Sequence, residues 1–157
     1  MSGTTPEALG IQDLIIGLKH VGVITTDMRA SLDSFRKLYE LRDEQVRVVP
    51  PLDEPCDTTR FAFVNVAGSQ FELIEPIGED FKRTLLSDRP GINHVAWEVR
   101  DIDAAVARLA QSGVRPGHVT PDGVIETPNF KMVYFRLEDT GDMLVELIEP
   151  KDGYDNR

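Results

Sequence analysis

The hydrophobic and polar positions of this chain form one pattern that occurs twice. Each half begins with a short β-branched run that predicts a strand, HVGVIT at 20–25 and HVAWEV at 94–99. An aspartate then stands as a candidate N-cap before apolar residues at helical spacing. These apolar stripes are Met28, Leu32 and Phe35 in the first half and Ile102, Val106 and Leu109 in the second. Two further strand-like runs close each half, FAFVNV with QFELIEP and KMVYFRL with MLVELIEP.

The two halves align without a gap. A shift of 74 residues places His20 on His94 and Glu72 on Glu146, so the histidine precedes the glutamate by 52 residues in both halves. The repeat predicts two modules. The expected segments are an N-terminal extension at 1–15, a first module at 16–76, a linker at 77–91, a second module at 92–150 and a C-terminal tail at 151–157. Residues 48–58, which hold three prolines and several acids, are expected to form a loop.

The repeated histidines and glutamates stand where a strand packed on a core would carry aliphatic residues. A single histidine on such a strand is more often a core residue, and a single glutamate more often faces solvent. As a set repeated at one spacing, His20, Glu72, His94 and Glu146 instead predict a shared partner, because an unpaired buried carboxylate is costly. Two carboxylates balance a divalent cation and two imidazoles add donors, which suits Zn, Ni, Co, Mn or Fe(II) and leaves positions for water or substrate.

The other candidate residues carry weaker signals. Glu75 and Glu149 also recur, but on the opposite strand face beside prolines, and they are expected to be solvated. His118 is expected in a loop, and Cys56, the single cysteine, in a packing role.

Composition limits the classes of partner. The 157 residues are 41% hydrophobic and 28% charged, which is typical of a globular domain, and the formal charge of −10 disfavours nucleic acid and anionic membranes. The first residues lack the basic and apolar order of a signal peptide, and the apolar run at 14–18 is too short to span a bilayer. We expect a cytoplasmic protein that acts on a small molecule.

The motifs HVGVITTDMRASLDSF, QFELIEP, GINHVAWEVRDIDAAVARLAQSGVR and MLVELIEP resemble the vicinal oxygen chelate superfamily over about residues 16–150. The resemblance implies an α+β fold of two tandem βαβββ modules that form a cupped mixed sheet. It also implies that His20, Glu72, His94 and Glu146 are the metal ligands. The methylmalonyl-CoA epimerase branch is the most similar, although Phe61, beside Arg60, stands where many of those enzymes carry a glutamate base. Their histidine-proline pair before the last ligand strand is also absent.

The resemblance implies a metal-dependent isomerase or lyase that transfers a proton next to a carbonyl through an enolate stabilised by the metal. Glu146, with Glu72 as its symmetric counterpart, is the candidate base. One alternative is an Fe(II) extradiol-type dioxygenase that uses His20, His94 and Glu146 as a facial triad. Another is a resistance protein that binds a small molecule without catalysis. A homodimer is expected, because the two predicted helices are too short to cover all the apolar sheet surface.

Overall fold

The computed structural model describes residues 10–84 and 89–154. The chain divides into two compact units. The N-terminal unit is Leu18–Ala96, and the C-terminal unit combines Trp97–Tyr154 with residues 10–17. No helix in the described part of the chain is long and apolar enough to cross a membrane.

The N-terminal unit contains five strands and two α-helices. They are β1 (Ile15–Ile24), α1 (Met28–Tyr39), β2 (Val46–Val49), β3 (Thr59–Val66), β4 (Ser69–Pro76), α2 (Glu79–Thr84) and β5 (Gly91–Val99). The strand order is β2-β3-β4-β1-β5. Strand β1 runs parallel to β4, whereas β2, β3 and β4 are successive antiparallel neighbours, so the sheet is mixed. Strands β1 and β5 each have one end in the other unit.

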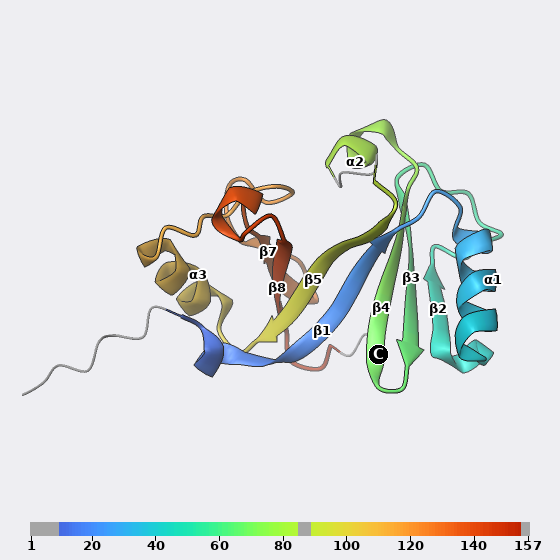
Figure 1. Ribbon diagram of the computed structural model, residues 1–157, viewed down its shortest axis with the longest axis horizontal. Coiled ribbons are helices and arrows are strands. Elements are labelled where there is room, and N and C mark those ends of the chain that lie inside the picture. Colours follow the sequence, from blue (N-terminus) through green and yellow to red (C-terminus); the bar gives the residue numbers. More distant parts are fainter. Residues whose placement is uncertain (1–9, 85–88, 155–157) are drawn as a thin grey trace, which may run out of the picture. The chain divides into compact units, whose positions relative to one another are not determined.

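Helix α1 covers one face of this sheet, beside β2 and β3 in Figure 1. Its N-cap is Asp27, whose side chain accepts a hydrogen bond from the backbone N–H of Ala30. Met28 and Leu32, predicted to be buried, pack in a core with residues of β3 and β4. The core face of β3 is formed by Ala62 and Val64. Because alternate strand residues face opposite sides, residues such as Phe61 and Phe63 lie on the face away from α1.

The C-terminal unit repeats the arrangement. It contains α3 (Ile102–Gln111), β6 (Ile125–Glu126), β7 (Phe130–Tyr134) and β8 (Leu144–Pro150), with the strand order β8-β7-β6. Asp101 caps α3 as Asp27 caps α1, and Ile102 packs in a core with residues such as Val133 and Leu147. The described residues also form three short 3₁₀ helices, at Gln12–Leu14, Asp43–Gln45 and Leu137–Asp139. The expected α+β class with two βαβββ modules is confirmed, whereas the boundaries 16–76 and 92–150 stay a prediction.

The expectation that Glu75 and Glu149 are solvated is wrong. The Glu75 carboxylate accepts a hydrogen bond of 3.1 Å from the backbone N–H of Met28, the first residue of α1. The Glu149 carboxylate accepts one of 2.7 Å from Ile102, the first residue of α3. The first N–H groups of a helix have no partner within the helix, and the helix dipole favours an anion there. Each glutamate therefore anchors a helix N-terminus to the last strand of its module.

Candidate metal centre

Three of the four predicted ligands meet in the N-terminal unit. The Nε2 atom of His20 lies 3.2 Å from an Oε atom of Glu72 and 3.1 Å from Nε2 of His94. Nε2 of His94 lies 3.6 Å from the same Glu72 oxygen. Both histidines are buried, and the Glu72 side chain is 14% exposed. Two imidazoles and a carboxylate therefore share one small, largely enclosed space.

The sheet places these side chains on one face. In the parallel pairing of β1 with β4, Gly22 is the register partner of Glu72, and His20 lies two residues before Gly22 on the same face of β1. His94 comes from β5, the neighbour of β1 in the strand order. The cluster thus comes from three consecutive strands, β4, β1 and β5.

Gly22 makes room for the His94 imidazole. A Cβ atom on Gly22 would lie 2.0 Å from Cε1 of His94 and 2.3 Å from Nδ1. Real carbon contacts are about 3.5 Å or longer, so no side chain other than hydrogen fits there while the ring keeps its place. In the second half the corresponding position is Ala96. The sequence alone does not indicate the need for this glycine, because the close approach of the ring comes from strand pairing and not from neighbouring residues in the sequence.

Asn93 orients His94. Its side-chain oxygen lies 2.9 Å from Nδ1 of His94. An amide oxygen only accepts hydrogen bonds, so this contact favours the tautomer with the proton on Nδ1 and leaves the Nε2 lone pair directed at His20 and Glu72. Hydrogen bonds of this kind fix metal-ligating histidines in many proteins. The corresponding residue before His20 is Lys19, whose ammonium group has no acceptor atom.

The donor set fits a divalent cation. Donor atoms about 2.1 Å from one ion lie roughly 3.0 Å apart at adjacent octahedral positions and about 3.4 Å apart in a tetrahedron. The observed separations of 3.1 and 3.2 Å are in this range, and the third, 3.6 Å, is about 0.2 Å longer than the tetrahedral value. All three residues offer one donor atom within 4.8 Å of the others. Nitrogen and oxygen donors without a thiolate match the metals expected from the sequence.

The electrostatics of Glu72 agree with this role. Burial raises the pKa of Glu72, but the charge of a protonated His20, the hydrogen bond from His20 and the contact with His94 outweigh burial and hold the pKa far below its ordinary value. The carboxylate is therefore ionised at neutral pH. An ionised carboxylate beside two imidazoles is a ready ligand for a divalent ion.

The fourth predicted ligand, Glu146, lies on β8 in the C-terminal unit. It is 3% exposed and stands opposite Tyr134 of β7 in the antiparallel pairing. Its neighbours on the same strand face, Leu144 and Ile148, are also buried, as the alternation predicts. Its assignment as a ligand rests on the repeat and stays a prediction. The predicted loop position of His118 is confirmed: it lies in a turn, with its ring centroid 6.3 Å from that of Tyr134.

No carboxylate occupies the strand position where the resemblance places a base. Phe61 of β3 pairs with Ile74 of β4 on the face that carries Glu72. Arg60 points to the other face, where its guanidinium lies 3.5 Å from Glu75 and donates to the backbone oxygens of Pro50 and Glu54. The arginine thus holds the loop after β2, and Phe61 adds an apolar surface near the metal cluster.

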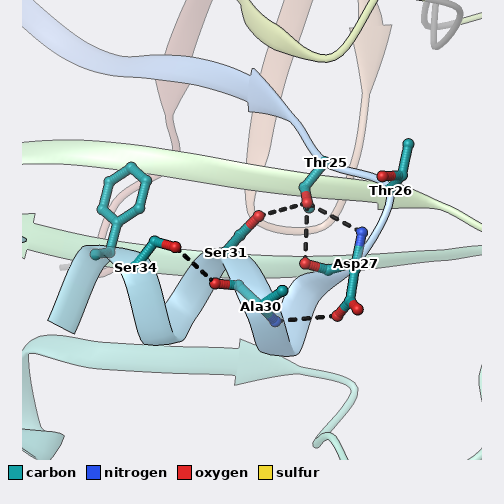
Figure 2. Close-up of a pocket in the computed structure, with 7 residues that line it drawn as sticks. Thr25, Thr26, Asp27, Ala30, Ser31 and Ser34 are labelled. Atoms are coloured by element: carbon teal, nitrogen blue, oxygen red, sulfur yellow. Dashed lines mark hydrogen bonds between the residues drawn. The ribbon is translucent and has the colours of Figure 1, made fainter. Parts of the chain in front are cut away.

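A separate pocket of about 270 Å³ lies beside the start of α1. Figure 2 shows that three of its hydroxyl groups bond to one another or to the helix backbone: Thr25 contacts Ser31 and the oxygen of Asp27, and Ser34 donates to Ala30. None of the three clustered ligands lines it. These bonds assign the hydroxyl groups of Thr25, Ser31 and Ser34 to the structure of the start of α1.

The paired modules and the cluster of two histidines and a glutamate define a class of metal-binding α+β proteins. The chain belongs to the Glyoxalase/Bleomycin resistance protein/Dioxygenase superfamily, whose family model matches residues 19–124. This membership confirms the predicted resemblance and fold.

The chain is similar to known epimerases. It is 32% identical over 101 residues to an ethylmalonyl-CoA/methylmalonyl-CoA epimerase of Cereibacter sphaeroides, covering 62% of this chain and 72% of the relative. It is 29% identical over 133 residues to the mitochondrial methylmalonyl-CoA epimerase of Mus musculus, covering 83% and 71%. The crystal structure of methylmalonyl-CoA epimerase from Mycobacterium tuberculosis superposes with a TM-score of 0.67 at 25% identity, covering 88% and 90% of the two chains. The similarity agrees with the predicted class, a metal-dependent isomerase.

Proposed function

We propose that this protein is a divalent-metal-dependent isomerase or lyase that removes and returns a proton on a carbon next to a carbonyl group. The observation that carries the proposal is the convergence of His20, Glu72 and His94 on one point. We assign Glu146 as the fourth ligand from the repeat. A bound divalent cation would act there as a Lewis acid that stabilises negative charge on the substrate oxygens.

The other roles in the proposed reaction are assigned to residues of this chain. Glu146 and Glu72 are the candidates for moving the proton, because a carboxylate that loosens from the metal is a base within reach of the substrate. The apolar surface of Phe61 lowers the local polarity and supplies no proton acceptor. Removal of the proton therefore falls to a ligand carboxylate, unlike in relatives that carry a separate glutamate at this strand position.

The substrate is proposed to be a small acid with two chelating oxygens. The named relatives act on methylmalonyl-CoA or ethylmalonyl-CoA, according to their names. We expect weak turnover of the CoA thioester here, because Phe61 replaces the base. Two basic residues that could attract CoA phosphates, Lys82 and Arg83, are paired within α2 with Glu79 and Asp80.

Metal analysis tests the proposal first. The purified protein should carry one divalent ion per chain, and alanine at any of the four ligand positions should lower the metal content. Added metal should raise the thermal midpoint of the wild type, because ligands that bind only the native state stabilise it. Glu44→Gln, at an exposed site, is the control. Full occupancy in the Glu72→Ala protein would exclude the four-ligand centre.

Solvent exchange tests the reaction. In ²H₂O, the metal-loaded wild type should introduce deuterium at the carbon next to the carbonyl of a small α-oxo acid, detected by mass spectrometry. Glu146→Gln should lower this rate more than it lowers metal content. A wild type that is fully loaded but exchanges no proton on either α-oxo acids or methylmalonyl-CoA would refute the proposed reaction.

A second candidate function is oxygen chemistry with Fe(II). The observed cluster is itself a set of two histidines and one carboxylate, the ligand type of non-haem Fe(II) oxygenases. In this case Glu72, not Glu146, completes the triad, which differs from the set expected from the sequence. Oxygen uptake by the Fe(II)-loaded protein with a catechol would favour this candidate, and its absence together with proton exchange would exclude it.

The proposal also includes a homodimer, a metal ion from the set Zn, Ni, Co, Mn or Fe, and a cytoplasmic location. Light scattering at micromolar concentration should give about twice the 17.6 kDa of one chain. Mixing a His20→Ala chain with a Glu146→Ala chain then tests where the centre is completed. Recovery of metal binding in the mixture indicates a centre built between chains, whereas no recovery indicates a centre within each chain.

A further inference from the structure

A row of side chains crosses the sheet of the N-terminal unit on the face that carries the metal cluster. Register pairs link Arg47 of β2 to Phe63 of β3, Phe63 to Glu72 of β4, and Glu72 to Gly22 of β1. Residues directly opposite one another in paired strands project to the same face. Arg47 therefore shares a face with the carboxylate of the cluster, two strands away.

The guanidinium of Arg47 is held toward the cluster. Its Cζ atom lies 4.6 Å from the centre of the Phe63 ring, a cation–π contact. Adjacent strands are about 4.8 Å apart, so the Cα atoms of Arg47 and Glu72 are separated by roughly 10 Å. Because the arginine leans over Phe63, its charged group lies above the strand between them. The contact with the ring restricts a side chain that would otherwise move freely.

The guanidinium has unused donors. Arg47 takes part in no ion pair within residues 10–84 and 89–154, and the side chain is exposed. This distinguishes it from Arg36 and Arg42, which pair with Asp43 and Glu44. A guanidinium presents several N–H groups in a planar fork that matches a carboxylate. In a chain with a formal charge of −10, an arginine kept apart from the acids is available to a ligand.

The charge balance of the centre indicates what that ligand carries. Two carboxylates, Glu72 and the proposed ligand Glu146, already balance a divalent ion. The charge of Arg47 is then left to balance an anionic group that does not coordinate the metal. Phe63 lies between Arg47 and Glu72 in the row of register pairs, and Phe61 is its neighbour on the same face of β3. These two rings suit a short apolar segment of the ligand.

We propose that Arg47 binds a second carboxylate of the substrate, so that the natural substrate is a dicarboxylic acid. One end provides the chelating oxygens, the other pairs with Arg47, and a short aliphatic chain spans Phe63. The inference rests on the proposed metal-dependent function. It makes Arg47 a specificity-determining residue, whereas the ligands and the base act on the chelating end of the molecule.

Matched pairs of 2-oxo acids test the inference on the Co²⁺-loaded protein, whose visible spectrum reports a chelator entering the metal site. 2-Oxoadipate and 2-oxohexanoate have the same number of carbons, and only the first has the distal carboxylate; 2-oxoglutarate and 2-oxopentanoate form the shorter pair. The wild type should bind at least one dicarboxylate more tightly than its partner. Arg47→Gln should weaken the binding of that dicarboxylate by about 10- to 100-fold, which is the range for a charged hydrogen-bonded pair. The Kd of the monocarboxylate should change by no more than about 2-fold.

Two further variants complete the experiment. Arg47→Lys keeps the charge without the fork and should recover part of the preference. Arg42 is an exposed arginine that pairs with Glu44 shortly before β2. Arg42→Gln should change the affinity for neither acid.

Three results would overturn the inference: no preference for either dicarboxylate in the wild type, equal weakening of both acids by Arg47→Gln, or no weakening at all. The proposed function fails separately, and the inference with it, when the wild type takes up no Co²⁺.

Discussion

Replacing Gly22 by alanine tests whether the three clustered side chains form a metal centre. The added Cβ would lie 2.0 Å from Cε1 of His94 and 2.5 Å from Nε2. A carbon–carbon contact settles at about 3.5 Å, so the imidazole has to move by roughly 1.5 Å. Metal–ligand distances tolerate shifts of only about 0.2 Å. The displaced His94 therefore no longer coordinates an ion held by His20 and Glu72.

The expected magnitude follows from the loss of one ligand from the proposed set of four. Sites with four protein ligands bind Zn²⁺ with about 10–16 kcal/mol, so one ligand contributes roughly 3 kcal/mol, or about a 100-fold change in Kd. Competition with a chromophoric chelator at neutral pH measures this Kd. Gly17→Ala is the matched control on the same strand, because a Cβ there meets nothing within 4 Å. Unchanged metal affinity in Gly22→Ala would refute the assignment of His94 as a ligand.

Three other changes give distinct expectations. Glu149→Ala should lower the free energy of unfolding by about 1–3 kcal/mol in urea denaturation, because the N–H of Ile102 loses a charged acceptor; an unchanged midpoint would contradict the anchoring role. Asn93→Ala should weaken metal binding by about 10- to 100-fold and Asn93→Asp should retain it, since the aspartate still accepts from Nδ1 of His94; equal affinities in all three proteins would exclude this role. The lowered pKa of Glu72 stabilises the metal-free protein at pH values above the ordinary pKa of 4.5, and this stability is lost as the pH falls toward the lower folded-state pKa. The loss of unfolding free energy caused by Glu72→Gln should therefore become smaller below about pH 4.5. A loss that does not depend on pH would refute the ion pairing.

The sequence alone was sufficient to find the cluster, because two simple regularities combine in it. Strand periodicity indicates which face a residue occupies, and the internal repeat indicates which residues of the two halves are equivalent. His20, Glu72 and His94 satisfy both, and the structure brings them together. Glu146 satisfies both as well, and its burial on β8 agrees with the alternation.

The residues that support the cluster could not be predicted in this way. Gly22 and His94 are far apart in the sequence, and the need for a glycine arises only when β1 and β5 become neighbours. Arg47 was also missed, because no strand was predicted from the residues between the first helix and FAFVNV, where the structure places β2, and the last residues of β2 lie in the stretch at 48–58 that was expected to be a loop. In both cases the information lies in the pairing of strands and not in local composition.

The two glutamates of each ELIEP motif explain why the motif occurs twice. They are three residues apart, an odd number, so a strand directs them to opposite faces. On β4, Glu72 faces the histidines, whereas Glu75 faces α1 and accepts a hydrogen bond from its first residue. On β8, Glu149 makes the equivalent bond to α3. One short motif thus places a carboxylate on each face of its strand, and the second carboxylate anchors the helix on that face. The second glutamate of the motif ties its strand to the helix that packs behind it. This hydrogen bond, together with the role of the first glutamate, accounts for a charged residue at each of the two positions of the motif.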